Sequence, residues 1–257
     1  FSGYSGSRTY GDNNSTIAYS GTLSGQKFVD DVVTVSGSVT DGTITNHSNA
    51  ASYSGVLQGA LSGASAGNYT LAAPVTGNLT INKALLSIAG YGGSRTYGDD
   101  NSTITYSGTL SGQKFADDDV NYSSSVDGSV TNHSNAGTQH NVLTASLTGT
   151  SADNYTLSLT NVPLTGDLNI NKAQLSIAGY SGSRIYGDDN STITYSGTLS
   201  GQKFADDVVG YTTSVDGAVT ERSNAGTHSN ALTATLTGAD AGNYTLSLTG
   251  APVTGDL

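Results

Sequence analysis

The chain lacks cysteine, methionine and tryptophan entirely, and its 257 residues include only 3 prolines. Without cysteine it has no disulfide framework, which would be expected in small eukaryotic secreted domains. This absence suits a bacterial protein that is exported unfolded, and it also suits a cytosolic protein. Disordered segments are usually rich in proline and glutamate, so the few prolines and the single glutamate, Glu221, argue against disorder.

Basic residues are also scarce. The 9 lysines and arginines are outnumbered by 20 acidic residues, and the formal net charge is −11. Because nucleic-acid-binding proteins need a basic surface to neutralise phosphates, this composition excludes that class. Binding to an anionic membrane surface is disfavoured for the same reason. No apolar run approaches the ~20 residues of a spanning helix, so we expect no membrane insertion.

The residues that are abundant favour short strands and tight turns. Hydrophobic residues make up only 35% of the chain, whereas glycine alone occurs 34 times and serine, threonine, asparagine and aspartate are frequent. Valine, isoleucine, threonine and tyrosine recur along the whole sequence, and these residue types prefer β-strands.

The chain consists of three copies of one unit. Ser-Arg-Thr-Tyr-Gly-Asp at Ser7–Asp12 returns at Ser94–Asp99, and as Ser-Arg-Ile-Tyr-Gly-Asp at Ser183–Asp188. The arginines are separated by steps of 87 and 89 residues. Such a period is too long for a solenoid coil and matches a small independent domain. We therefore expect three tandem domains, called repeat one, repeat two and repeat three: residues 1–82, 83–171 and 172–257.

Within repeat two, apolar residues alternate with polar ones, as they do in β-strands. The sets that share a face are Leu86 and Ile88; Ile104 and Tyr106; Leu143, Ala145 and Leu147; Tyr155, Leu157 and Leu159; and Leu168 and Ile170. This pattern predicts an all-β fold of antiparallel sheets with one face in water. Val126–Ser129 predicts a hairpin turn, because Asp-Gly tolerates positive φ angles. Leu110–Val120 is the one candidate for a helical turn.

The linkers between repeats predict a rod. Ile81–Ala84 and Ile170–Ala173 contain neither proline nor a run of glycine and serine, so we expect short, stiff connections. A compact domain of this length has a radius of gyration of about 18 Å. Three domains in line would give roughly 35 Å, at the rise of a β-strand. Small-angle scattering measures this radius, and the compact value would contradict the rod.

Several motifs recur in a fixed order. They are Tyr-Gly-Asp (Tyr10–Asp12, Tyr97–Asp99, Tyr186–Asp188), Tyr-Ser-Gly, Ser-Asn-Ala-Gly-Thr (Ser134–Thr138, Ser223–Thr227), Asn-Tyr-Thr-Leu and the closing Gly166–Ala173. This ordered set resembles the MBG-type repeats, of the YGX and YDG kinds, in large bacterial surface exoproteins. Filamentous-haemagglutinin-like adhesins of the two-partner secretion class are among them. Repeat one departs at Ser48–Ser52, where Gly-Thr is missing.

The resemblance implies a β-sandwich or β-grasp-like module in an extracellular stalk at the bacterial surface, and it supplies no catalytic residues. We therefore expect a monomeric section of a longer array that acts as a spacer and whose main partners are neighbouring repeats. Binding of matrix polysaccharide by the repeats, and a rod stiffened by Ca²⁺, are the alternatives. We expect no enzyme, since there is no Gly-x-Ser-x-Gly elbow and the histidines shift between repeats.

Carboxylates near the junctions are the candidate metal ligands: Asp117, Asp118, Asp206 and Asp207. Ca²⁺ prefers six to eight oxygen ligands. However, the chain has no Asp-x-Asp-x-Asp-Gly loop, and solvated turn residues are the simpler interpretation. Chelation that leaves the melting temperature unchanged would remove the calcium hypothesis. The histidines form no metal-binding pattern, so we expect polar loop residues: His47, His133, His140 and His228.

The candidate ligand-binding residues are Arg8, Arg95, Arg184, Tyr91 and Tyr180. An arginine on a β surface can clamp a carboxylate or lie against a tyrosine ring. We expect each of these arginines to pair with a nearby aspartate, and contact with polysaccharide is the alternative. Tyrosine rings can stack on sugars. Tyr155 and Tyr244 are in phase with leucines, which predicts that they lie in the core.

Overall fold

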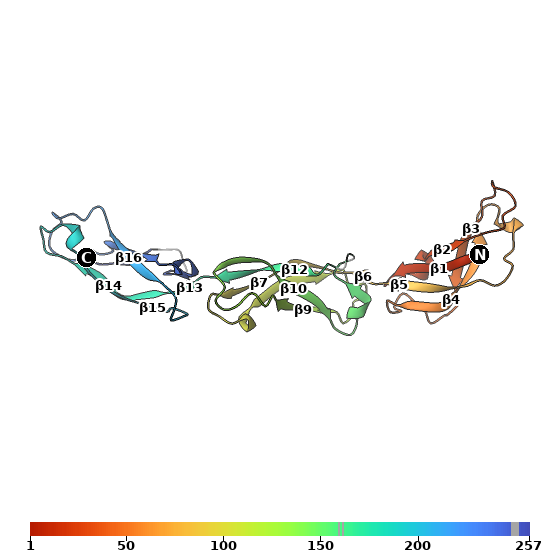
Figure 1. Cartoon of the computed structure of the whole chain (residues 1–257), viewed down its shortest axis with the longest axis horizontal. Helices are drawn as coiled ribbons and strands as arrows, with labels where there is room; N and C mark the ends of the chain where they lie inside the picture. Colours follow the sequence, from red (N-terminus) through yellow and green to blue (C-terminus); the bar gives the residue numbers. More distant parts are fainter. Residues whose placement is uncertain (159, 161, 248–251) are drawn as a thin grey trace. The chain divides into compact units, whose positions relative to one another are not determined.

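The computed structural model describes residues 1–158, 160, 162–247 and 252–257. The described part consists of β-strands joined by turns and short 3₁₀ helices (Figure 1), which confirms the all-β class. No helix in these ranges is long and apolar enough to cross a membrane. Leu159, which was assigned to an alternating strand with Tyr155, lies outside the described residues.

Repeat one contains one five-stranded sheet with the order β2-β1-β5-β4-β3. Its elements are β1 (Ser2–Thr9), η1 (Asn14–Thr16), β2 (Ala18–Thr22), β3 (Thr34–Val39), β4 (Ser52–Ser62), η2 (Ala66–Asn68) and β5 (Thr76–Asn82). The first and last strands, β1 and β5, run parallel with Arg8 opposite Ile81. The other neighbours in this sheet are antiparallel. Figure 1 shows these strands in red to yellow.

Repeat two repeats this sheet with the order β8-β7-β12-β10-β9. Its elements are β6 (Ala84–Leu85), β7 (Ser87–Thr96), η3 (Asn101–Thr103), β8 (Thr105–Ser111), β9 (Asn121–Val126), β10 (Gly137–Thr148), η4 (Ala152–Asn154), β11 (Tyr155–Thr156) and β12 (Leu164–Asn171). Strands β7 and β12 are parallel, and Ile170 lies opposite Arg95. The two short strands β6 and β11 pair separately.

Repeat three has the same strand order as the other two repeats, but its last strand is shorter. Its elements are β13 (Ala173–Gln174), β14 (Ser176–Ser183), η5 (Asn190–Thr192), β15 (Thr194–Ser200), β16 (Gly210–Val215), β17 (Leu232–Thr237), η6 (Ala241–Asn243), β18 (Tyr244–Thr245) and β19 (Val253–Gly255). Strand β14 pairs with β15, and β17 lies between β16 and β19. A parallel bridge from Ser181 to Asp256 connects the two groups.

The parallel central pair corrects the expectation of purely antiparallel sheets. A parallel neighbour requires a long crossover connection, and here the whole repeat between β1 and β5 forms it. Periodicity along one strand does not reveal this pairing, because alternation looks the same in either direction. A β-sandwich stacks two antiparallel sheets, whereas repeats one and two each have one mixed sheet, apart from the short linker pairs.

The core of repeat one lies on one face of its sheet. Leu79 and Ile81 on β5 are buried, and their strand neighbours are exposed. Two loops cover this face by inserting Ile17 and Ile44. A Cβ atom at Gly6 would lie 2.7 Å from Ile17 Cγ2, so the close approach of this loop requires glycine. One face is therefore in water, as the alternation predicted.

Two local predictions are corrected. The helical turn expected in Leu110–Val120 is a β-turn, in which Asp118 N–H donates to the Phe115 carbonyl at 3.3 Å. The Asp-Gly turn forms after Val126 but without a positive φ at Gly128. Instead, Asp127 Oδ1 accepts from Ser129 N–H at 2.8 Å, and an Asx-turn of this kind needs no left-handed residue.

The contacts of the described residues divide the chain into two compact units. Unit 1 comprises Phe1–Gly90, Gly108–Ser124 and Ala145–Leu164, and unit 2 comprises Tyr91–Ser107, Ser125–Thr144 and Thr165–Leu257. Unit 1 therefore contains the junction of repeats one and two, and unit 2 contains the junction of repeats two and three. The division into three domains at 82/83 and 171/172 stays a prediction.

Candidate functional site at the repeat junctions

Each linker enters the next repeat as a short strand. In unit 1, β6 pairs in parallel with β11, and Leu86 N–H donates to the Thr156 carbonyl at 2.8 Å. Because strand side chains alternate, Ala84 and Leu86 point inward and are buried, whereas Leu85 is exposed. In unit 2, β13 pairs with β18 in the same way, and Leu175 N–H donates to the Thr245 carbonyl at 2.8 Å.

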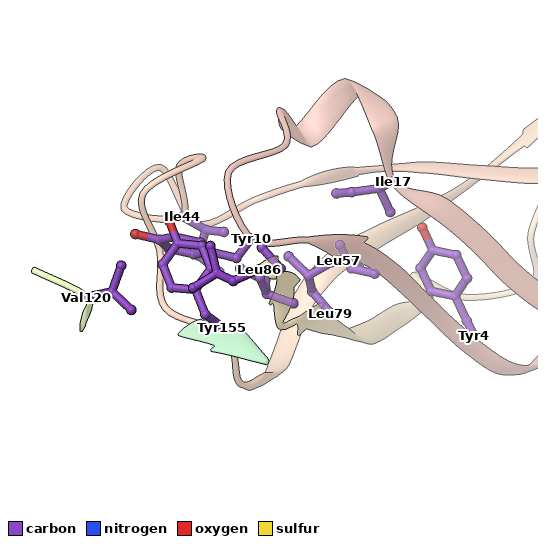
Figure 2. Packing of buried hydrophobic residues seen from close by; sticks show 11 residues of the cluster. Tyr4, Tyr10, Ile17, Ile44, Leu57, Leu79, Leu86, Val120 and Tyr155 are labelled. Carbon is purple, nitrogen blue, oxygen red and sulfur yellow. The ribbon is translucent and has the colours of Figure 1, made fainter. Parts of the chain in front are cut away.

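A single carboxylate joins tyrosines of two repeats in unit 1. Tyr10 of repeat one donates its hydroxyl hydrogen to Asp118 Oδ1 at 2.8 Å. Tyr155 of repeat two donates to Oδ2 of the same aspartate. The two rings meet edge to face with centroids 5.4 Å apart, next to Leu86 and Val120 (Figure 2). We call this arrangement the tyrosine clasp. Each carboxylate oxygen accepts one hydrogen bond, one from each repeat.

The clasp is built again in unit 2. Tyr97 of repeat two donates to Asp207 Oδ1 at 3.0 Å, and Tyr244 of repeat three donates to Oδ2. The ring centroids are again 5.4 Å apart. Tyr97 and Tyr244 are both almost completely buried. The burial predicted for Tyr155 and Tyr244 is confirmed, but the core they belong to spans two repeats.

Burial shifts the acidity of the clasp tyrosines. Desolvation, followed by the hydrogen bond to Asp118, raises the pKa of Tyr155 to about 12. The same causes raise the pKa of Tyr244 to about 12 beside Asp207. The pKa values of Tyr10 and Tyr97 are raised further, chiefly by burial. All four phenols are therefore neutral donors at neutral pH.

Alkaline pH is expected to loosen both junctions. Folding raises these pKa values above that of an unfolded tyrosine, about 10. Their contribution to stability is therefore complete below about pH 10 and is lost as the pH rises through the folded value, about 12 for Tyr155 and Tyr244. The melting temperature should be level near neutrality and fall over this window, together with the appearance of tyrosinate absorbance. A level profile through the window would contradict the clasp.

A histidine stacks on a phenylalanine beside each clasp. His47 of repeat one lies on Phe115 of repeat two with ring centroids 3.6 Å apart and an interplanar angle of 20°. His133 lies on Phe204 at 3.6 Å and 18°. Both histidines lie in exposed turns, as predicted for polar loop residues, and each also stacks on a phenylalanine of the next repeat.

Two buried asparagines connect the backbones of adjacent repeats. Asn154 Oδ1 accepts from Ala50 N–H at 2.8 Å, and its Nδ2 donates to Asn49 Oδ1 at 3.1 Å. In unit 2, Asn243 binds the Asn135–Ala136 segment with the same two distances. Both amide groups are buried, so using the donor and the acceptor together avoids the desolvation penalty of an unpaired polar group.

The Tyr-Gly-Asp motif is explained by the junction. Its tyrosine belongs to the clasp, and its aspartate forms an ion pair with a lysine of the next repeat: Asp12 with Lys114 at 3.3 Å, and Asp99 with Lys203 at 2.9 Å. The glycine has φ +87° in repeat one, and a Cβ atom at Gly11 would lie 2.6 Å from Lys114 Cγ. Exposed ion pairs of this kind contribute only about 0–1 kcal/mol.

The candidate arginines bind carbonyl groups and not carboxylates, so the predicted pairing with aspartate is wrong. In repeat two, Arg95 donates to Asn101 Oδ1 at 3.0 Å and to the carbonyls of Thr96 and Thr131 at 3.1 and 2.5 Å. Its side chain is only 4% exposed. Burial lowers its pKa, against the opposing effect of Asp99 and Asp100.

The other two arginines occupy equivalent places. Arg8 is also 4% exposed and donates to Asn14 Oδ1 and to the Thr45 carbonyl. Arg184 is half-buried and donates to the carbonyls of Asp188 and Thr220. Arg8 and Arg95 therefore hold three chain segments together and present no guanidinium surface to a polysaccharide.

The candidate tyrosines are half-buried against their own sheets. The rings of Tyr180 and Tyr211 meet edge to face with centroids 5.8 Å apart. The Tyr180 hydroxyl donates to Thr213 Oγ1 at 3.2 Å. Tyr91 lies over Gly166, where a Cβ atom would be 2.7 Å from its ring. Both residues are therefore partly covered by their own repeat, which reduces the ring surface that sugar stacking could use. Tyr106, Tyr186 and Tyr195 are more exposed.

The candidate metal ligands divide into two kinds. Asp118 and Asp207 are the clasp carboxylates, whereas Asp117 and Asp206 are exposed. In the described part of the chain, no three histidine or acidic side chains come together as a metal-binding group. Sequence reasoning missed Tyr10, Tyr97 and the two asparagines as interface residues. Their fixed places in the recurring motifs were the available signal.

The junctions bring together hydrogen bonds, ring stacks and ion pairs, all of which hold one repeat against the next. No family model, no curated protein and no solved structure matches the chain.

Proposed function

We propose that this chain is a spacer in a bacterial cell-surface or biofilm-matrix adhesin, where it holds a distal binding region away from the cell. The observation that supports this most directly is that the same junction is built twice, from equivalent residues at nearly identical distances. A spacer requires a joint that can be repeated, and both junctions meet that requirement.

The most regularly recurring residues support the proposal. Tyr-Gly-Asp, Gln-Lys-Phe and Asn-Tyr-Thr all place side chains in the junctions. Residues that recur because they bind a ligand would leave their polar groups open to solvent. Here those polar groups contact the adjacent repeat, so these residues recur because they hold neighbouring repeats together.

The proposed location at the bacterial surface is supported by composition and by the MBG-type motif order. A chain with no cysteine and a net charge of −11 remains soluble without disulfides and repels nucleic acids. The proposal includes no enzymatic activity, and it places the adhesive surface outside these repeats.

Carbohydrate binding remains the second proposal, because of two equivalent tyrosines. Tyr106 on β8 is 36% exposed and Tyr195 on β15 is 40% exposed. Repeated rings of this kind could act together as a weak multivalent surface. The arginines no longer support this alternative, since Arg8 and Arg95 are buried.

A display experiment separates the two proposals. The chain is inserted between a bacterial surface anchor and a tip domain of known ligand, with one, two or three repeats. Adhesion to the immobilised ligand should increase with repeat number while the affinity of the tip stays constant. The matched control lacks the tip and should not adhere to the ligand or to matrix polysaccharides.

Adhesion of the tip-less control to polysaccharide, with loss on replacing Tyr106 and Tyr195 by alanine, would make the repeats themselves the binding surface. Adhesion that does not change with repeat number would contradict the spacer.

A further inference from the structure

The first and last strands of the sheet in repeat one lie side by side. Strands β1 and β5 run parallel over five residue pairs, the last of which is Thr9 opposite Asn82. We call these two strands the parallel pair. Repeat two has the same arrangement in β7 and β12, again over five residue pairs (Figure 1). The chain therefore enters and leaves both sheets through neighbouring parallel strands.

The points of entry and exit lie at opposite ends of the parallel pair. Strand β1 begins at Ser2 and ends at Thr9, which lies beside Asn82, the last residue of β5. The two points are therefore separated by the length of β1, which is roughly 23 Å at the rise of a β-strand. Tension along the chain acts parallel to both strands and pulls them in opposite directions.

Tension in this direction loads the hydrogen bonds between the two strands together. These bonds lie across the strand axis. Sliding β1 along β5 stretches all of them at once, so that they share the force. A pair that is pulled apart from one end behaves differently. Its bonds break one after another, because the whole force falls on each bond in turn.

The parallel pair lies inside the sheet and not at its edge. Strand β2 flanks β1, and β4 flanks β5. On the core face, Leu79 and Ile81 of β5 are almost completely buried. Tyr10 N–H extends the ladder by donating to the Asn82 carbonyl at 2.8 Å. Hydrogen bonds next to a buried face are stronger than bonds in water, since the local dielectric constant is lower.

Arg8 connects β1 to segments outside the parallel pair. It lies opposite Ile81 in the ladder. Its guanidinium donates to Asn14 Oδ1 at 3.0 Å and to the Thr45 carbonyl at 2.5 Å. Strand β1 can slide along β5 only if these charge-assisted bonds break together with the ladder. Arg95 of β7 makes the equivalent bonds in repeat two, so both copies are built in the same way.

We propose that repeats one and two are force-bearing modules, in which the parallel pair acts as a clamp against tension along the chain. The proposal rests on the spacer function for the source of that tension: a distal region bound to a surface pulls on the repeats that carry it. It goes beyond that function, because a spacer needs only length, whereas a clamp keeps the length constant under load.

Single-molecule force spectroscopy on the full chain tests the clamp. The chain contains no cysteine, so two introduced cysteines define where the force is applied. Ser2→Cys with Asn82→Cys pulls β1 and β5 along each other. Ser2→Cys with Thr76→Cys is the matched control, because both points then lie at the same end of the parallel pair. All three positions are exposed, and the melting temperature should stay that of the parent chain.

At the same loading rate, the force along the strands should exceed the force of peeling about threefold or more, since several bonds share it. Forced unfolding reports the unfolding rate. Leu79→Ala removes a buried side chain behind the ladder and should speed unfolding about tenfold or more at a fixed force along the strands. Leu79→Val is the milder change if that variant does not fold. Leu85→Ala, at an exposed position outside the pulled segment, should leave the rate unchanged.

Two outcomes would overturn the proposal. One is an equal force in both directions of pulling, and the other is that Leu79→Ala unfolds under load as slowly as Leu85→Ala. The adhesion of displayed repeats enters neither result. A chain that fails as a spacer can thus still contain the clamp, and an equal force would leave the spacer proposal intact.

Discussion

Asp118→Ala is expected to lower the free energy of unfolding by about 3–5 kcal/mol. The change removes the acceptor of two hydrogen bonds, each worth roughly 1.5–3 kcal/mol when one partner is charged. It also leaves the Tyr10 and Tyr155 hydroxyls, which lie on nearly buried rings, without their carboxylate. Urea denaturation followed by tyrosine fluorescence measures the change as a shift of the midpoint.

Three variants calibrate this effect. Asp117→Ala removes the exposed neighbour and should change stability by no more than about 0.5 kcal/mol. Asp31→Ala removes the acceptor of Tyr69 in repeat one and should cost about half as much as Asp118→Ala. Asp207→Ala should behave as Asp118→Ala does. Equal effects of Asp117→Ala and Asp118→Ala would show that the clasp contributes nothing beyond charge.

Arg95→Ala is expected to cost about 3 kcal/mol or more. Its guanidinium makes three charge-assisted hydrogen bonds inside the repeat, and its removal takes one donor away from the Thr131 carbonyl, the Thr96 carbonyl and Asn101 Oδ1. Arg95→Lys should recover little of this loss, because an ammonium group does not reproduce the planar fork. Thermal and urea unfolding both report the change.

Arg184→Ala is the internal comparison for Arg95. The equivalent side chain in repeat three is half-buried, and we expect a loss of only about 1 kcal/mol. Arg222→Ala, at an exposed position, should be neutral within about 0.5 kcal/mol. If Arg95→Ala leaves stability unchanged and removes polysaccharide binding, the structural role assigned to this arginine is wrong.

Part of the fold could be predicted from alternation. Leu143 and Ala145, or Leu168 and Ile170, follow a period of two, and all four are buried on one face. This periodicity follows directly from strand geometry, so it is visible in one chain. The parallel pairing of β7 with β12 was not visible, since it depends on which distant segment lies next to the strand.

The junction was harder to predict than the core. Asp118 and Asp207 stood out as carboxylates, but their partners lie 108 and 110 residues earlier, in the preceding repeat. Local reasoning recognised Tyr10 and Tyr97 as members of a recurring motif but gave neither them nor the asparagines a structural role. A three-fold repeat offered one further signal: a residue that recurs in every copy without a role inside that copy is a candidate for contact with the next.

The pairing of one tyrosine from each repeat with a shared carboxylate has a genetic consequence. Each repeat carries both halves of the interface, the Tyr-Gly-Asp side and the Gln-Lys-Phe side, so any repeat of this kind can follow any other. Recombination between copies that gains or loses whole repeats therefore creates no mismatched joint. Recombination out of register does create a mismatched joint, because it separates the two halves of the interface. The array can change its length in whole steps without any new interface having to evolve.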